Sequence, residues 1–469
     1  MVADDGTAEK RWDQALSGNG AAGADGNGST ALSRDGDRAD GDGATTLSRD
    51  GAAGADGDRA DGDGATTLSR DGAAGADGTV VATNVVRLAE IVPGASGWSS
   101  SLVVHDDPVT GPSEEPIVGP EGTAPETGDR VVVPRLARHE IVLDDDHRVG
   151  VAVCGQGMPL VLVHGFTAEG ILYAQTLSRL VAMGFKVVAI DVAGHGATQG
   201  LPTGGDDLAA YADLLGRVLD ELGIRRAVLA GHSMGGRLVT QLAADQPDRA
   251  VAVVLIDAVV GQCWDRLIGL SRFAPPVLVG LTALLVVDTL STLPLLRNPT
   301  QAAKLGRLLG PTLLGHARRP WRMLGPAVSL LRSSGSGGML DALAKARVPV
   351  VVIHGDRDMP VPYATAVDAA RRSGGTLVTV KGGTHSWVLK DPETLPSIVA
   401  ELLDGPLARV RAAVLGAAGL RPDASPEQIE ATFLGPHAWV RYLTPRLEKR
   451  TIAEHHHRSR YRWTVEQPA

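Results

Sequence analysis

From about His139 onward, short runs rich in Val and Ile alternate with stretches that have the apolar periodicity of amphipathic helices. The runs that predict buried strands are 160–163, 186–190, 227–230, 251–256, 348–353 and 376–380. The stretches that predict helices are 173–183, 208–222, 234–246, 363–372 and 395–403. This alternation predicts an α/β fold whose mostly parallel sheet has helices on both faces, preceded by a hairpin at 140–143 and 148–153.

The alternation is interrupted once, by a Leu-rich insert at residues 258–346 that has a helical pattern and several prolines. We expect a helical cap there, because open α/β sheets place their sites at the carboxyl ends of the strands and the insert follows a strand. Its longest uncharged run, residues 273–287, is shorter than the roughly 18–20 residues of a membrane-spanning helix. We interpret it as an apolar surface of a soluble domain, and we do not expect membrane association.

The first part of the chain has a different composition. Residues 1–80 are dominated by Gly, Ala and Asp, and the sequence ATTLSRDGAAGADG at 44–57 recurs at 65–78. Each copy has one Leu as its large apolar residue, so no core could offset the entropy lost on folding. We therefore predict disorder for residues 1–80 and an extended linker for residues 81–137.

The α/β core is expected at residues 138–257 and 347–405, followed by a helical extension at 406–469. Amphipathic patterns in that extension allow it either to pack on the core or to mediate association. His455, His456 and His457 are adjacent and stand among arginines, which predicts a solvated basic surface rather than a metal site.

Composition restricts the partners and the compartment. A net charge of −9, from 45 basic and 54 acidic residues, gives no reason to expect a nucleic-acid partner. Cys154 and Cys263 are far apart and have neither metal-binding nor redox spacing, so a reducing cytoplasm is the simplest location. The first residues have no apolar core of a secretory signal.

One short motif carries most of the chemistry: Gly231-His232-Ser233-Met234-Gly235. A predicted strand precedes it and a predicted helix follows it, so Ser233 sits on a sharp strand-to-helix turn that the small glycines permit. Such a turn exposes the serine hydroxyl as a nucleophile. The alternative is a glycine-rich turn whose serine only caps the helix.

A serine nucleophile needs a general base and donors for an oxyanion. His385 follows the last predicted strand and is the expected base. The N–H of Phe166, in the loop after the 160–163 strand, and the N–H of Met234 are the expected oxyanion donors. The orienting acid is assigned to Asp358, because the chain order serine, acid, histidine then matches the fold; Asp356 and Asp257 are the alternatives.

These segments resemble the α/β-hydrolase fold superfamily, in the serine esterase and lipase-like branch with a helical cap. The resemblance covers about residues 138–405 and rests on five segments in the family's order: PLVLVHGF, DVAGHG, GHSMGG, VVVIHGDRD and GTH. It implies an eight-stranded sheet, no cofactor, hydrolysis through an acyl-enzyme and a structural role for His195. A serine at position 233 excludes the branch similar to epoxide hydrolases and haloalkane dehalogenases, which have aspartate there.

The expected function is hydrolysis of a small to medium apolar carboxylic ester, without cofactor or metal. The cap is expected to line the pocket or to pack on the core with its apolar side chains, which are Leu267, Ile268, Leu270, Phe273, Val277, Leu278, Leu281, Leu284 and Leu285. Thioester hydrolysis, carbon–carbon bond hydrolysis and perhydrolysis would use the same triad. A non-catalytic ligand-binding or scaffold protein is the alternative of another class.

Overall fold

The computed structural model describes residues 83–87, 101–105, 130–166, 168–201, 207–291, 314–315, 318, 320–333, 335–443, 445–451 and 459–467. The strands are β1 (Thr83–Arg87), β2 (Ser101–His105), β3 (Arg130–Arg135), β4 (Ala137–Val142), β5 (Arg148–Cys154), β6 (Met158–Val163), β7 (Phe185–Ile190), β8 (Ala227–His232), β9 (Ala250–Ile256), β10 (Val350–Gly355), β11 (Thr376–Lys381), β12 (Arg446–Thr451) and β13 (Arg462–Glu466). The repeats of residues 1–80 and the histidines at 455–457 lie outside the described residues.

The α-helices are α2 (Ala174–Ala182), α3 (Leu208–Glu221), α4 (Met234–Asp245), α5 (Gln262–Ser271), α6 (Pro275–Leu290), α8 (Leu324–Arg332), α9 (Gly337–Lys345), α10 (Tyr363–Ser373), α11 (Trp387–Lys390), α12 (Thr394–Asp404), α13 (Ala408–Ala417) and α14 (Pro426–Phe433). Short 3-10 turns are η2 (Gly170–Tyr173), η3 (Pro247–Arg249), η4 (Pro320–Met323) and η5 (Trp439–Arg441). The strands and helices predicted for the core are all present, which confirms the alternating pattern.

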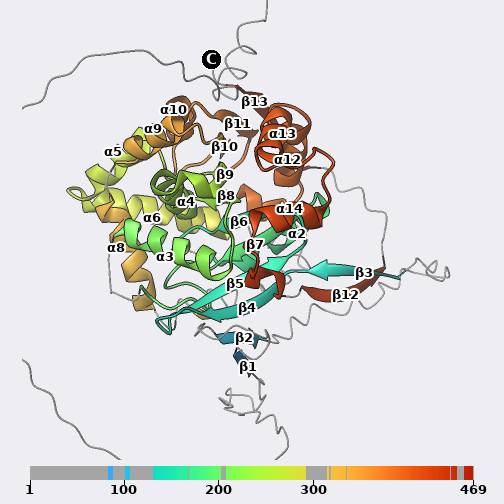
Figure 1. Ribbon diagram of the computed structural model, residues 1–469. Coiled ribbons are helices and arrows are strands. Elements are labelled where there is room, and N and C mark those ends of the chain that lie inside the picture. The colour runs from blue at the N-terminus through green and yellow to red at the C-terminus, as the bar shows by residue number, and fades with distance from the viewer. Residues whose placement is uncertain are drawn as a thin grey trace, which may run out of the picture. The chain divides into compact units, whose positions relative to one another are not determined.

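Eleven strands of the described residues form one sheet, in the order β1-β2-β4-β5-β7-β6-β8-β9-β10-β11-β13 (Figure 1). The six central strands from β7 to β11 are parallel, and β5 and β4 continue the sheet antiparallel as the predicted hairpin. The strands from β4 to β11 are the eight that the family resemblance implies. β1 and β2, from the segment expected to be a linker, extend one edge, and β13 covers the other.

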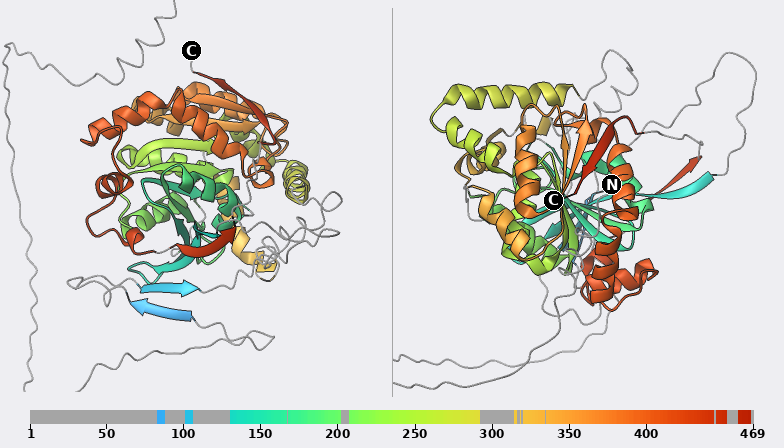
Figure 2. Two further views of the ribbon diagram at one scale, coloured as in Figure 1. Left: turned by 90° about the vertical axis from the view of Figure 1, so that its right-hand side faces the viewer. Right: turned by 90° about the horizontal axis from the view of Figure 1, so that it is seen from above.

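The central strands are buried on both faces, which explains why their sequences are continuously apolar. In β6, Val161 and Val163 pack into a cluster with side chains of α3, α4, α9 and α10. Leu160 and Leu162 point the other way, into a cluster with side chains of α2, α11 and α12. Figure 2 shows the resulting arrangement of one sheet between two helical layers. This arrangement brings the carboxyl ends of β6, β8, β9, β10 and β11 to one edge.

The insert between β9 and β10 contains α5, α6, η4, α8 and α9. α9 contributes Leu340 and Leu343 to the main core cluster, so it packs as part of a helical layer. Ile268 is buried, but Phe273 is 88% exposed and Leu270 is 55% exposed. The expectation that these apolar side chains line a pocket or pack on the core is therefore wrong for Phe273 and Leu270. None of the helices described here is both long and apolar enough to cross a membrane.

The C-terminal extension packs on the core, and it contains strands as well as the expected helices. β12 pairs with β3 in a separate two-stranded sheet, while β13 pairs with β11. The carboxylate of Glu430, on α14, lies 3.4 Å from the Lys186 ammonium, and both side chains are buried. Phe433 is 1% exposed and its carbonyl accepts from the Arg225 N–H at 3.1 Å. Strand pairing at an open sheet edge satisfies backbone groups that a helix there would leave unpaired.

Candidate active site

Ser233 lies at the junction of β8 and α4 with φ 53° and ψ −118°. A positive φ is uncommon for a residue with a side chain, so surrounding contacts must hold this turn. The Ser233 N–H donates to the Ile256 carbonyl at 2.9 Å, and the Ser233 carbonyl accepts from the Val259 N–H at 3.2 Å. The Ser233 side chain makes no capping hydrogen bond to α4, so the alternative that it only caps the helix is wrong.

Glycine is required on both sides of Ser233 because the backbone passes at very close range. A Cβ on Gly231 would lie 2.4 Å from the backbone of Gly235, and one on Gly235 would lie 2.1 Å from the Val163 carbonyl oxygen. Carbon atoms do not approach that closely without a backbone shift. The first turn of α4 therefore packs directly against the end of β6, which brings the loop after β6 to the serine.

Ser233, His385 and Asp358 form a continuous hydrogen-bonded chain. His385 Nε2 lies 2.9 Å from Ser233 Oγ, and His385 Nδ1 lies 2.7 Å from Asp358 Oδ2. The other carboxylate oxygen of Asp358 accepts from the Val361 N–H at 2.7 Å. Since the carboxylate accepts from Nδ1, the neutral imidazole leaves Nε2 free to accept from the serine hydroxyl. All three residues are buried, so little water competes for these bonds.

The two alternative acids have different surroundings. Asp356 accepts from the Gly382 N–H at 2.7 Å and lies 4.0 Å from the Lys381 ammonium. Asp257 is fully buried at the end of β9 and accepts from the Gly355 N–H at 2.8 Å. Burial and the neighbouring Asp358 charge raise the pKa of Asp257 well above its usual value. Of the three acids, Asp358 is the one hydrogen-bonded to His385.

Neighbouring charges set the protonation of the histidines. Burial lowers the pKa of His385, but the charge and hydrogen bond of Asp358 and the charge of Asp288 outweigh burial. The net pKa of His385 is therefore above the usual value. For His232, which is the residue before Ser233, burial and the nearby His385 charge outweigh the opposing contributions and lower its pKa to about 3. His232 is thus neutral wherever His385 titrates.

The loop after β6 passes directly beside the serine. A Cβ on Gly165 would lie 3.1 Å from Ser233 Cβ. The Gly165 carbonyl lies 2.7 Å from His164 Nδ1 and accepts from the Ala168 N–H at 3.1 Å. Because a trans peptide directs its C=O and N–H to opposite sides, these contacts fix the direction of the Phe166 N–H. His195 Nε2 bonds the Phe166 carbonyl from the other side of the residue, in keeping with a structural role for His195.

Comparison with known proteins identifies the family of this chain. A model of the alpha/beta hydrolase family matches residues 160–395, which is half of the chain. The chain belongs to the alpha/beta hydrolase family. Its fold, an α/β arrangement with a mostly parallel sheet between helices, is the one that the sequence predicted.

Individual relatives cover the same part of this alpha/beta hydrolase. A putative non-heme haloperoxidase of Mycobacterium phage D29 is 35% identical over 275 residues, which are 57% of this chain and 96% of that protein. A non-heme chloroperoxidase of Streptomyces lividans is 28% identical over 273 residues, 52% of this chain and 91% of that protein. A solved esterase from Rhodococcus sp. ECU1013 matches with a TM-score of 0.45 and 23% identity, covering 58% of this chain and 99% of that one.

Two residues that the sequence did not reveal, His232 and Tyr173, form hydrogen bonds that lead to the backbone of His385 in the hydrolase. His232 Nε2 lies 3.0 Å from the His385 carbonyl oxygen, so Nε2 carries the proton and donates it. His232 Nδ1 then accepts from the Tyr173 hydroxyl at 2.9 Å. The only signal in the sequence was a polar side chain beside the serine at the end of an apolar strand. Tyr173 gave no signal, because it lies 59 residues earlier in the chain.

Asp257, His354 and Asp358 are the described residues close enough together to suggest a metal site. Most of their atoms already have protein partners, and Asp257 Oδ2 and His354 Nδ1 are the two buried atoms of the group that make no hydrogen bond. Asp358 binds His385 and Val361, and His354 Nε2 donates to the Val361 carbonyl at 2.9 Å. Burial lowers the pKa of His354, so its ring is neutral. The group is therefore best described as the packed support of the Asp358 carboxylate.

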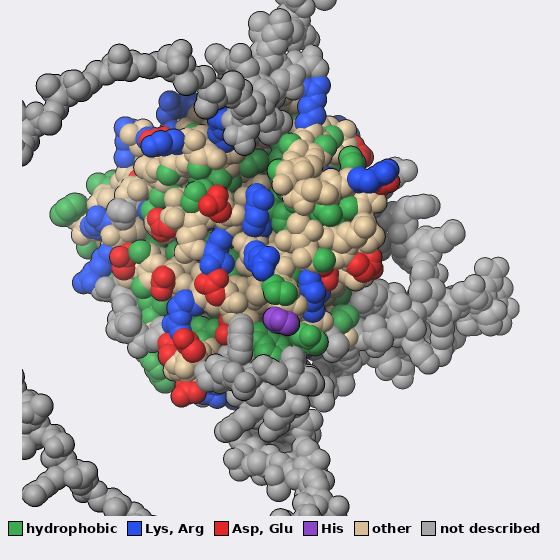
Figure 3. Space-filling model, in the orientation of Figure 1, with side chains coloured by type: hydrophobic (Ala, Val, Ile, Leu, Met, Phe, Trp, Pro, Cys, Tyr) green, Lys and Arg blue, Asp and Glu red, His purple; other side chains and the backbone are tan. Residues whose placement is uncertain are grey.

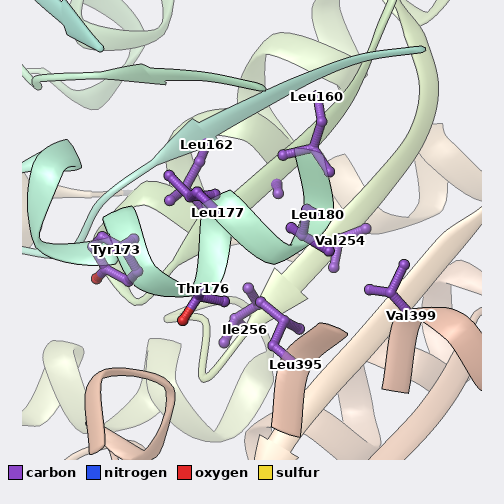
Figure 4. Close-up of a pocket in the computed structure, with 11 residues that line it drawn as sticks. Leu160, Leu162, Tyr173, Thr176, Leu177, Leu180, Val254, Ile256, Leu395 and Val399 are labelled. Carbon is purple, nitrogen blue, oxygen red and sulfur yellow. The ribbon is translucent and has the colours of Figure 1, made fainter. Parts of the chain in front are cut away.

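Figure 4 shows a pocket inside the apolar core of the hydrolase, between the sheet and the helices α2 and α12. Its lining is almost entirely aliphatic and contains no member of the chain Ser233–His385–Asp358. The lining residues are Leu160, Leu162, Tyr173, Thr176, Leu177, Leu180, Ala230, Val254, Ile256, Leu395 and Val399. This pocket is a packing space beneath the site and offers no group for chemistry on a substrate.

Proposed function

We propose that this protein is a serine hydrolase that cleaves carboxylic esters through an acyl-enzyme, with Ser233 as nucleophile, His385 as base and Asp358 as the orienting acid. The observation that carries the proposal is the buried chain of bonds from Ser233 Oγ through both nitrogens of His385 to Asp358. A hydroxyl is activated in this way when the base accepts its proton and a carboxylate stabilises the resulting imidazolium. Membership of the alpha/beta hydrolase family supports the same assignment.

In the first step, Ser233 Oγ attacks the ester carbonyl carbon while His385 Nε2 takes the hydroxyl proton. The imidazolium that forms donates to Asp358 through Nδ1 and to the departing group through Nε2. The negative charge on the carbonyl oxygen would rest on the N–H groups of Phe166 and Met234. Supporting this, Gly165 holds the Phe166 peptide beside the serine, and Met234 begins α4, where N–H groups have no helical partner.

In the second step, the departing alcohol leaves with the proton from His385. His385 then accepts a proton from water, which attacks the acyl carbon and releases the carboxylic acid and Ser233. All of these bonds are made and broken without a cofactor or metal.

The substrate we propose is a small to medium ester with an apolar acyl or alcohol group. Buried aliphatic side chains of the insert such as Ile268 support an apolar substrate, because the insert follows β9 at the edge where Ser233 lies. The two cysteines carry no disulfide, and we retain the cytoplasm as the proposed location.

A fluorophosphonate probe gives the most direct test, since an activated serine displaces its fluoride and becomes phosphonylated. Wild type should be labelled and should hydrolyse p-nitrophenyl butyrate, whereas Ser233→Ala should lose both properties. We expect a decrease in kcat on the order of 10⁶-fold for the variant. Labelling that persists in Ser233→Ala would refute the assignment, and an unlabelled wild type would favour a ligand-binding or scaffold role.

Perhydrolysis is a second candidate, favoured by the names of two relatives, a putative non-heme haloperoxidase and a non-heme chloroperoxidase. Here hydrogen peroxide, instead of water, attacks the same acyl-enzyme and releases a peracid, which then oxidises halide. Bromination of monochlorodimedone in acetate, peroxide and bromide would measure it. The ratio of peracid formation to ester hydrolysis decides between the two candidates, with Ser233→Ala as the shared control.

A further inference from the structure

The polarity of α6 is the reverse of what a peripheral helix normally has. Its sequence, PPVLVGLTALLVVDTL, contains one charged residue, Asp288. Asp288 is 8% exposed, whereas the apolar Val279 is 68% exposed and Val287 is 64% exposed. The view from above in Figure 2 shows α6, in yellow-green, at the outside of the molecule. A helix that packed by hydrophobicity alone would turn its carboxylate to water, so a specific interaction must hold it inward.

The buried carboxylate of Asp288 meets the segment that carries His385. Its Oδ1 atom lies 3.6 Å from the Lys390 ammonium, and both side chains are less than a tenth exposed. Lys390 in turn donates to the Thr384 hydroxyl at 2.5 Å. Burial raises the pKa of the Asp288 carboxyl, but the nearby Ser386, Thr384 and Lys390 side chains together bring it below its usual value. Asp288 therefore meets the segment that carries His385 through Lys390, although it lies on a helix of the insert.

We propose that Asp288 is a positioning residue. Its buried ion pair with Lys390 holds α6 against the 384–390 segment. The cap and the catalytic histidine therefore keep a fixed position relative to each other. This inference rests on the proposed function for the role of His385. Beyond that function, the inference says that the position of α6 depends on the charge of Asp288 rather than on apolar packing. A cap movement that carried Asp288 away would also release the histidine segment.

The cost of separating buried charges explains why the ion pair of Asp288 and Lys390 can fix the position of α6. Separating two buried opposite charges leaves each of them without water or partner, which is strongly unfavourable. The contact is therefore either fully made or lost together with the cap position. Apolar contacts alone would let α6 slide, because neighbouring leucines and valines are nearly equivalent packing partners.

The charges around His385 give the pair a distinctive signature. Asp358 and Asp288 both raise the pKa of His385, while Lys390 lowers it. The positive charge of Arg460 also lowers the pKa of Lys390. The negative charge of Asp288 also contributes to raising the pKa values of His232 and Asp257. Removing the anion of the pair must therefore lower the pKa of His385, and removing the cation must raise it.

The test uses Asp288→Asn, Lys390→Met and the double variant, with Val279→Asn as a control that adds the same amide to the exposed side of α6. Both single variants should lower the midpoint of thermal unfolding and reduce kcat/KM for an apolar ester about 10-fold. The double variant should recover part of both losses, because it leaves no unpaired charge. Val279→Asn should behave as wild type.

The decrease of kcat/KM at acidic pH then distinguishes a positioning role of Asp288 from an effect on stability alone. It should move to lower pH in Asp288→Asn and to higher pH in Lys390→Met, although both variants break the same pair. Movement in the same direction, or no movement in active variants, would overturn the inference. NMR titration of His385 in a Ser233→Ala background reads the same shifts without activity, so a wrong proposed function and a wrong inference give different results.

Discussion

The turn at Ser233 and the helix α6 lie in the same molecule but satisfy their polar groups in opposite ways. At the turn, polar atoms are held by residues close to the strand ends, and the glycines leave no room for anything larger. On α6, apolar side chains face outward and the one carboxylate is buried against a distant segment. The first region is fixed by close steric contacts and hydrogen bonds at the strand ends, and the second by a single charge contact between the insert and the 384–390 segment. The face in Figure 3 shows the more usual surface, with acidic and basic side chains interspersed.

Beyond the serine itself, the largest expected effect concerns the two carboxylates at the strand ends. Asp358→Asn should reduce kcat on the order of 10⁴-fold, because an amide cannot hold the required tautomer of His385. Asp257→Asn should reduce kcat less than about 10-fold, since Asp257 does not bond His385 and an amide oxygen can still accept from the Gly355 N–H. Steady-state kinetics on one ester compare them. If Asp288→Asn reduced kcat as much as Asp358→Asn, the serine turn and α6 would not differ in their importance for catalysis as we expect.

Glycine substitutions sharpen the contrast in stability. Gly235→Ala should lower the free energy of unfolding by about 1–3 kcal/mol and abolish labelling, because its Cβ would overlap the Val163 carbonyl. Gly280→Ala, within α6, has no atom within 4 Å of the added Cβ and should raise the free energy of unfolding by about 0.5–1 kcal/mol. Urea titration measures both. Equal effects of the two substitutions would show that the turn is not sterically constrained.

The pH dependence of wild-type activity follows from the raised pKa of His385. The base must be neutral to accept the serine proton, so activity is present above that pKa and lost below it. We expect kcat/KM to decrease about 10-fold per pH unit below a midpoint that lies above 6.5. His232, with a pKa near 3, should add no second limb between pH 5 and 8. A profile that stays flat down to pH 5.5 would contradict this assignment of the base.

The smallest effect is expected at the outer surface of the insert. Phe273 is 88% exposed, so Phe273→Ser should change the free energy of unfolding by no more than about 0.5 kcal/mol. Thermal unfolding in parallel with wild type is sufficient to measure it. A loss above 1 kcal/mol would mean that this ring is packed in solution and that the polarity of the insert is less inverted than the structure indicates.

Sequence reasoning reached the core elements and the serine–histidine chemistry because both depend on short-range patterns. Val and Ile runs predict strands, and a glycine-flanked serine between a strand and a helix predicts the turn. It left three candidate acids, since Asp257, Asp356 and Asp358 all follow predicted strands and differ only in their neighbours. It also missed β13, whose partner β11 is about 80 residues earlier, and the bonds from Tyr173 through His232 to His385.

The sequence by itself determined the alternation of strands and helices, the order of the motifs and the presence of glycine on both sides of the serine turn, because each is visible in adjacent residues. The need for glycine at position 235 depends on its approach to Val163, which only the folded chain provides. Only the tertiary structure decided which acid bonds His385, how α6 is turned and where the C-terminal strand pairs. Those outcomes depend on groups that meet across 27 residues for Asp358 and His385, or between the insert and the core for Asp288 and Lys390. Burial then gives each such contact its strength, and burial exists only once the chain has folded.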